Sequence, residues 1–241
     1  MGKAGDVGIK VGCCGFPMAR RRYFERFSVV EVQKTFYQPP RTETLRRWRE
    51  EAPPAFEFTL KAWQLITHPP QSPTYRRLKH PIPEEKRERY GYFRPTEEVM
   101  AAWEATKEAA QALSASFVVF QTPASFEPTP EHIAHLKAFF GNIERGGLAL
   151  GWEPRGAWPR EEAHGLCQAL SLVHIVDPFK VPPFPDPLRY FRLHGITGYR
   201  YRFTDGDLER LRGFCGGTTY CMFNNLSMAE DAKRFMALLG G

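Results

Sequence analysis

Short apolar runs alternate with amphipathic stretches along the chain, and this alternation restricts the fold more than any other feature. The strand-like runs fall at residues 7–13, 29–34, 56–61, 117–121, 148–153, 172–177, 189–194 and 218–223. Between them, apolar residues repeat at helical spacing at about 42–51, 96–114, 130–140, 160–170, 205–213 and 227–239. Strands that alternate with helices pair in parallel. Eight such strands in 241 residues predict an α/β fold, a (β/α)8 TIM-like barrel for which an irregular or incompletely closed form is also considered. A doubly wound sheet stays open as the alternative.

No repeat, low-complexity tract or linker divides the sequence, so we expect one domain over residues 1–241. The longest irregular stretch is 68–95, where prolines and charges exclude a regular strand and 83–90 has the pattern of a short helix. Long ordered loops in compact domains are often functional. The segment is therefore predicted to lie over the active face as a lid.

Composition narrows the class of protein. A mean hydropathy of -0.43 and the lack of any apolar run of about 20 residues exclude a membrane span, and no signal peptide is recognisable, so we expect a cytoplasmic protein. Twenty-one prolines, many arginines and few asparagines indicate a heat-adapted source. The five cysteines have no zinc spacing and are expected to be small buried hydrophobes.

Polar residues occupy one face of several predicted strands, because successive strand residues point to opposite sides. In 56–61, Glu57, Thr59 and Lys61 share a face opposite three apolar residues. The same alternation selects Glu31, Gln33, Glu153, Arg155, Arg192 and His194, and three other strands end in Gln121, Asp177 and Asn224. This predicts a polar barrel interior near the carboxyl ends of the strands, where barrel enzymes build active sites.

A self-paired ion network is the alternative explanation for these charges, since a buried charge requires a partner. The predicted interior holds nearly equal numbers of acidic and basic groups: Glu31, Glu57, Glu153 and Asp177 against Lys10, Lys61, Arg155 and Arg192.

Two adjacent carboxamides, Asn224 and Asn225, follow the last predicted strand in a chain that otherwise holds only Asn142. A carboxamide offers donors and an acceptor without charge, which suits an oxyanion, a phosphate oxygen or a hydroxyl. For Asn225, a turn residue that bonds locally is an equally good explanation.

Several of these segments resemble the YecE-like family, domain of unknown function 72. The motifs are VGCCGF (11–16), VVEVQKTFYQPP (29–40), FEFTLKAWQLITH (56–68), FQTPASF (120–126), WEPRGAW (152–158), FRLHG (191–195) and FNN (223–225). Gln33 and the CCGF segment depart from the family pattern. The resemblance implies a β/α barrel with a polar pocket at the carboxyl ends, and no assigned reaction.

The chemistry of these residues suggests roles. His194 is a candidate general acid or base, with Glu153 and Asp177 as an acid/base pair. Lys61 is a phosphate ligand or an amine nucleophile, or it pairs with Glu31 or Glu57. Candidate substrate contacts are Arg192, Asn224, Asn225, Gln121, Glu31, Tyr37, Arg155, Tyr199 and Tyr201.

We therefore expect an enzyme that acts on an anionic or phosphorylated substrate, including nucleotide-like ligands, by hydrolysis or acid/base chemistry. The net charge of +6 also fits a nucleic-acid-binding or repair-related protein that uses Arg20–Arg22, Arg76, Arg77 and Arg200. A glycosidase with two carboxylates is a third hypothesis. No cofactor is identified, and a divalent metal is not favoured, because no HxH or HExxH spacing occurs. The oligomeric state is left open.

Overall fold

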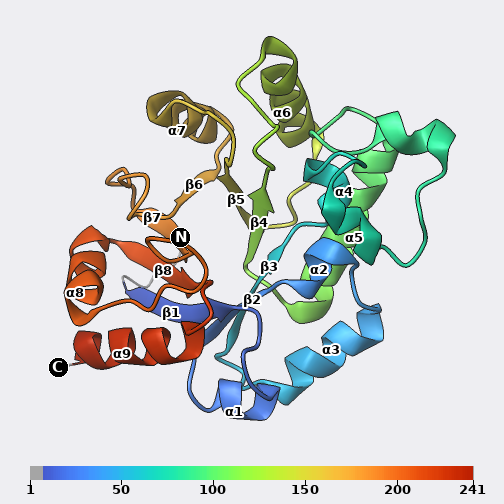
Figure 1. Ribbon diagram of the computed structural model, residues 1–241. Coiled ribbons are helices and arrows are strands. Elements are labelled where there is room, and N and C mark those ends of the chain that lie inside the picture. Colours follow the sequence, from blue (N-terminus) through green and yellow to red (C-terminus); the bar gives the residue numbers. More distant parts are fainter. Residues whose placement is uncertain (1–7, 241) are drawn as a thin grey trace, which may run out of the picture.

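The eight predicted strands form a closed parallel barrel in the computed structural model, which describes residues 8–240 (Figure 1). Each strand pairs in parallel with the next, and β8 pairs with β1 to close the sheet. The barrel prediction is thus confirmed, except that residue 7 of the first predicted strand lies outside the described residues. The strands are β1 Ile9–Cys14, β2 Val29–Val32, β3 Glu57–Lys61, β4 Phe117–Gln121, β5 Ala149–Glu153, β6 Val173–Val176, β7 Leu188–Leu193 and β8 Thr218–Phe223.

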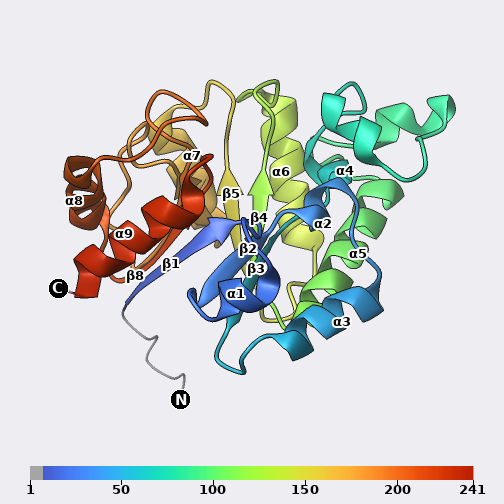
Figure 2. The same cartoon turned by 60° about the horizontal axis from the view of Figure 1, so that its bottom comes forward.

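Helices surround the barrel on its outer side (Figures 1 and 2). The predicted helices correspond to α3 Thr42–Glu51, α5 Glu97–Leu113, α6 Pro130–Asn142, α7 Arg160–Ala169, α8 Asp205–Phe214 and α9 Met228–Gly240. Shorter helices lie in the connections: α1 Arg20–Phe24, α2 Lys34–Tyr37, α4 Gln64–Thr67, and the 3₁₀ turns η1 Pro73–Arg77 and η2 Glu84–Arg89. Within residues 8–240, no helix has both the length and the apolar character of a membrane span.

Threonine side chains determine where several of the helices begin. Thr96 and Thr129 accept hydrogen bonds from the backbone N–H groups of Val99 and His132. Thr204 and Asp207 bond reciprocally at the start of α8. Such caps satisfy N–H groups that have no partner within the helix.

An apolar layer fills the middle of the barrel interior. Tyr190 on β7 contacts Phe117 on β4, with ring centroids 4.7 Å apart, although these strands are not neighbours in the sheet. Tyr220 stacks on Tyr190 at 5.2 Å. On β5, a side chain at Gly151 would come within 2.7 Å of Phe117, so only glycine leaves room for this layer. The layer separates polar groups at the two ends of the barrel.

The segment 68–95 lies beyond the carboxyl ends of the strands, at the rim beside α4 and α5 (Figures 1 and 2). The N–H groups of Gly91 and Phe93 donate to Leu65 and Ile66 at 2.8 and 2.9 Å, and Tyr92 contacts Phe126 after β4. The segment therefore borders the barrel mouth on its β3–β4 side. Its role as a lid stays a prediction.

Candidate active site

Arg192 joins two buried carboxylates at the carboxyl end of the barrel. It projects from β7 and is 1% exposed. Its Nη2 donates to Glu31 Oε1 at 2.9 Å and its Nη1 to Glu153 Oε2 at 2.5 Å, while Gln121 accepts from Nη1 at 2.9 Å. Tyr190 donates to Glu31 Oε2 at 2.8 Å. The inner faces of β2, β4, β5 and β7 thus meet at one guanidinium, as the alternation of polar residues predicts.

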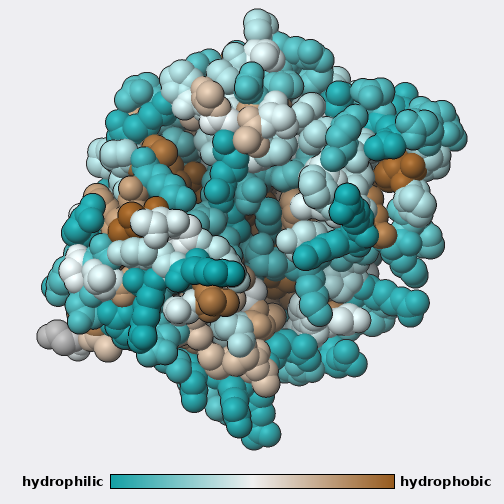
Figure 3. All heavy atoms as spheres, viewed as in Figure 1, coloured by the Kyte–Doolittle hydropathy of each residue, from teal (hydrophilic) through white to brown (hydrophobic). Residues whose placement is uncertain are grey.

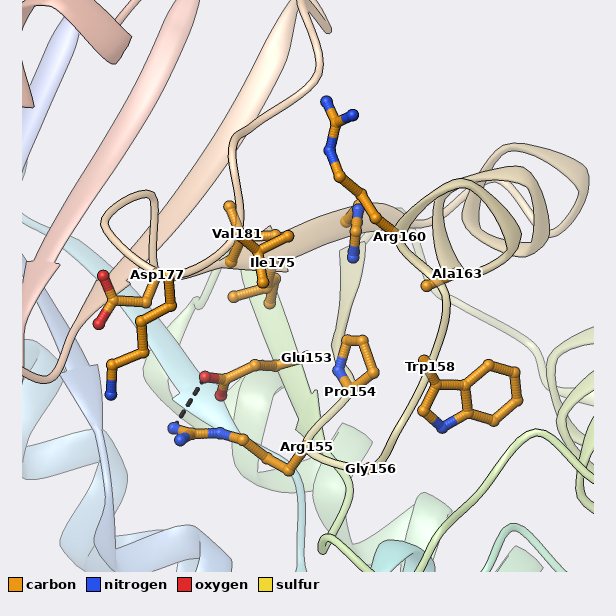
Figure 4. Close-up of a pocket in the computed structure, with 13 residues that line it drawn as sticks. Glu153, Pro154, Arg155, Gly156, Trp158, Arg160, Ala163, Ile175, Asp177 and Val181 are labelled. Atoms are coloured by element: carbon orange, nitrogen blue, oxygen red, sulfur yellow. Dashed lines mark ion pairs between the residues drawn. The ribbon is translucent and has the colours of Figure 1, made fainter.

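Glu153 stays ionised because two arginines contact it. Arg155 Nη2 lies 2.8 Å from its Oε1, and Figure 4 shows the two side chains facing each other. Burial alone would raise the pKa of Glu153, but the charges of Arg192 and Arg155 outweigh burial and lower that pKa to about 2. Glu153 is therefore a charge partner at neutral pH and has no proton to donate.

His194 lies just past the end of β7, between Asp177 and Arg155. Asp177 Oδ2 accepts the backbone N–H of His194 at 3.0 Å and lies 3.5 Å from its Nδ1. Arg155 contacts the other ring nitrogen, Nε2. Burial lowers the pKa of His194, and Asp177 and Glu153 only partly oppose this effect. The imidazole is therefore neutral near pH 7. The Asp177 carboxylate beside Nδ1 and the Arg155 guanidinium beside Nε2 favour the tautomer with its proton on Nδ1.

Lys61 is the last residue of β3 and has no acidic partner. Among residues 8–240, no carboxylate oxygen lies within the 4.0 Å of an ion pair with its Nζ, so the alternative of a pair with Glu31 or Glu57 is not realised. The Nζ lies 3.5 Å from the centre of the Phe36 ring. Burial lowers the pKa of Lys61 to about 7, and the charge of Arg192 adds to this effect.

Asn224 and Asn225 differ in what their side chains do. Asn225 is fully buried and donates to Tyr201 O and Asp231 Oδ2, both at 2.7 Å, which ties α9 to the loop after β7. Asn224 is partly exposed, and its side chain makes no hydrogen bond in the part of the chain that the structure describes. Only Asn224 is thus left available to a ligand.

The predicted aromatic contacts lie away from Arg192. Tyr201 donates to Asp207 Oδ2 at 2.6 Å, at the start of α8, and Tyr199 is 57% exposed in the same loop. Tyr37 ends α2 and lies beneath Arg77, 4.2 Å from its guanidinium. Whether any of the three contacts a ligand stays a prediction.

Three residues near the centre were absent from the predicted site: Phe36, His68 and Tyr190. Tyr190 shares the inward face of β7 with Arg192, so the alternation that selected Arg192 also pointed to it. Phe36 lies in the short helix α2 and His68 directly follows α4, with ring centroids 4.9 Å apart. Burial, with the nearby Lys61, lowers the pKa of His68 to about 3. No strand pattern points to residues in the connections between strands and helices.

A cavity of about 140 Å³ opens beside these groups, between β5, β6 and α7. Glu153, Arg155 and Asp177 line one side of it, and Trp158 lines the opposite side (Figure 4). Lys180 also lines the cavity. Figure 3, which looks onto the carboxyl end of the barrel, shows a hollow near the middle of the view with hydrophilic residues along much of its rim. A small polar molecule therefore has space next to the charged groups.

Two of the kinds of site considered from the sequence can be compared with the side chains. Across residues 8–240, no three His, Cys, Asp or Glu side chains are grouped to hold a metal ion, and Arg192 occupies the position between Glu31 and Glu153 that a cation would need. A glycosidase with two carboxylates needs one that is protonated. Glu153 does not suit that role, because its pKa is lowered to about 2, and the glycosidase hypothesis stays a prediction.

Within the basic run Arg20–Arg22, which was expected to bind nucleic acid, some arginines form ion pairs with glutamates. Arg20 on α1 lies 2.8 Å from Glu51, and Arg21 lies 3.8 Å from Glu25. These contacts fit a solvated helix surface. Nucleic-acid binding stays a prediction.

Residues 18–241 match the model of a family described as protein of unknown function DUF72. A DUF72 family protein from Enterococcus faecalis V583 is similar in structure, with a TM-score of 0.73 and 19% identity over 99% of this chain and 100% of its own. One from Thermotoga maritima MSB8 has a TM-score of 0.67 and 20% identity over 97% and 99%. A D-psicose 3-epimerase, solved in the presence of D-fructose, has a TM-score of 0.56 and 13% identity over 92% and 93%. No protein of curated function matches the sequence.

Proposed function

Because the chain belongs to the DUF72 family, whose description assigns no reaction, we propose its function from the site: an enzyme that moves protons on a small, oxygen-rich anionic substrate at the barrel mouth. The resemblance to the YecE-like family and the TIM-barrel fold are both consistent with this proposal.

The observation that carries the proposal is the contact between Arg155 and His194 Nε2. Asp177 lies at Nδ1, so Nε2 is the nitrogen that can accept a proton. The Arg155 side chain is 33% exposed and can rotate toward a bound anion. An anionic group that pairs with Arg155 would therefore release Nε2 in the same step, so that His194 becomes a base only when substrate is bound.

The cations around the mouth suit the charge that such a reaction develops. Removal of a proton next to a carbonyl leaves negative charge on oxygen, and positioned donors and cations stabilise it. Arg155, Lys61 and the carboxamide of Asn224 are available for this, while Arg192 holds the array together through Glu31 and Glu153. The epimerase neighbour, with its ketose ligand, supports carbonyl-containing polyols as the substrate class. Hydrolysis gains no support from these neighbours.

The experiment is solvent exchange. The protein is incubated in D₂O with a panel of ketoses, aldoses, their phosphates and hydroxy acids, and loss of C–H signals is followed by proton NMR. We expect exchange next to the carbonyl of at least one anionic compound, reduced on the order of 10²-fold or more in His194→Ala.

His164→Ala is the matched control, because this histidine also pairs with a carboxylate but lies away from the mouth. Its Nε2 is 3.0 Å from Asp186 Oδ2. It should keep the wild-type exchange rate. Equal rates in wild type and His194→Ala, or no exchange with any compound of the panel, would reject the proposal.

A further inference from the structure

We propose that Lys61 forms an imine with the carbonyl carbon of the substrate, so that the enzyme works by covalent amine catalysis. The inference rests on the proposed function for its substrate class, a small hydroxy-carbonyl compound. It adds a covalent intermediate that proton transfer by His194 alone does not require.

The position of Lys61 suits a nucleophile. It ends β3 at the carboxyl end of the barrel, where the other side chains of the site gather. Only 6% of the residue is exposed, and among residues 8–240 its Nζ has no hydrogen-bond partner. The face of the Phe36 ring, 3.5 Å away, holds it in place without accepting a conventional hydrogen bond.

The surrounding groups give Lys61 little net stabilisation as an ammonium, although the face of the Phe36 ring attracts a cation. Arg192 and Arg155 repel it, and the carboxylates that attract it, Glu31 and Glu153, are already paired with guanidiniums. His68, on the loop after α4, stays neutral. The pKa of about 7 that results from burial and these charges leaves roughly half of the amine unprotonated at pH 7, as a nucleophilic lysine requires.

The reaction needs no redox partner. Nζ adds to the carbonyl carbon, and a proton moves from nitrogen to oxygen. A second proton, taken from solvent, lets that oxygen leave as water and gives a protonated C=N bond. The protonated imine withdraws electrons from the adjacent carbon, whose proton passes to His194 Nε2. Return of that proton to either face, followed by addition of water, releases product and restores the amine.

The test traps the imine. The full-length protein is incubated at pH 7 with dihydroxyacetone and sodium cyanoborohydride, and adducts are located by peptide mass spectrometry. Lys10 is the internal control, because it is also a barrel lysine but is paired with Glu57 at 2.6 Å. We expect Lys61 to be labelled at least about tenfold faster than Lys10 or the surface lysines, since its unprotonated fraction is about 10³-fold larger than that of an ordinary lysine. Labelling at the rate of the surface lysines would overturn the proposal.

Two variants and the exchange assay separate the outcomes. Lys61→Arg and Lys61→Met should both lose the dominant adduct while their melting curves stay cooperative. If the wild type exchanges C–H protons but gives no Lys61 adduct, the imine is wrong and the proposed function stands. If the adduct forms without exchange, proton transfer by His194 is wrong and the imine stands.

Discussion

The two ends of the barrel interior both bury charge, but only one of them pairs all of it. At the amino end, Lys10 contacts Glu57 at 2.6 Å, and Glu57 also accepts hydrogen bonds from Ser116 and Tyr220. Burial alone would lower the pKa of Lys10, but Glu57 outweighs it, so the pKa is raised. Among residues 8–240, Lys10 and Glu57 at this end are paired with each other, as in a structural ion pair.

The carboxyl end contains a larger network with one group left over. Arg192 satisfies Glu31 and Glu153, and Arg155 satisfies the remaining oxygen of Glu153. Lys61 lies among these groups without an acid of its own. The self-paired network considered from the sequence is therefore present for most of the charges. In our proposal, the unpaired lysine rather than the network is the reactive position.

Among the substitutions that test this difference between the two ends, loss of Arg192 should have the largest effect on stability. Arg192→Met leaves two carboxylates buried without their partner, so we expect it to lower the free energy of unfolding by about 3–5 kcal/mol, measured by urea denaturation at pH 7. Lys10→Met at the other end should cost about 1 kcal/mol or less, because Lys10 is 33% exposed. Equal losses would mean that the two ends do not differ in structural importance.

Loss of Lys61 should change stability in the opposite direction. Lys61→Met removes a buried amine that lacks a partner, so we expect the free energy of unfolding at pH 7 to rise by about 1–3 kcal/mol. In the wild type, the folded pKa of about 7 lies below the unfolded value of about 10.4. The unfolded chain then binds more protons in this window, and stability should rise with pH from 7 to about 10 relative to the variant. A lower stability of Lys61→Met at pH 7 would indicate a hidden partner.

Removal of Arg155 should move the pH dependence of exchange. Arg155 is one of the charges that lower the pKa of His194, so Arg155→Gln should raise this pKa. The reaction needs neutral His194, so on acidification the variant should lose activity at a higher pH than the wild type does. If the acid side of the pH–rate profile of C–H exchange is the same in Arg155→Gln and wild type, Arg155 does not control the pKa of His194.

The smallest expected effect is that of Lys10→Met on the rates of C–H exchange and Lys61 labelling. The amino end is separated from the mouth by the apolar layer of Phe117, Tyr190 and Tyr220. Exchange rate and Lys61 labelling should stay within about twofold of wild type in the same assays. A larger loss would show that the two ends are coupled.

The barrel and the inward face of its strands were predictable because both follow from local periodicity. Which of the inward-facing side chains pair with one another was not predictable in this way. Glu57 and Lys61 share a face of β3, and a strand rises about 3.3 Å per residue, so four residues separate them by about 13 Å and bring them to opposite ends of the barrel. Which acids reach Arg192 depends on how the sheet closes, which no single strand encodes.

Residues in the connections were the other part of the site that local periodicity could not predict. Phe36 and His68 reach Lys61 from connections whose course follows from packing rather than from a pattern. Asn225 belongs to the packing of α9, as its alternative role as a local hydrogen-bonding residue suggested. The side chain of Asn224, one residue earlier, stays available. Adjacent identical residues can thus serve different purposes.

The charge of Lys61 tests the account most directly. Its pKa can be read from the ¹³C shift of its Cε across a pH titration, with Lys10 in the same spectra as the reference and Lys61→Met for assignment. The account predicts a midpoint near 7 for Lys61 and one above the ordinary lysine value for Lys10. A Lys61 midpoint at about 10.4 or higher, as for a solvated or ion-paired lysine, would contradict it.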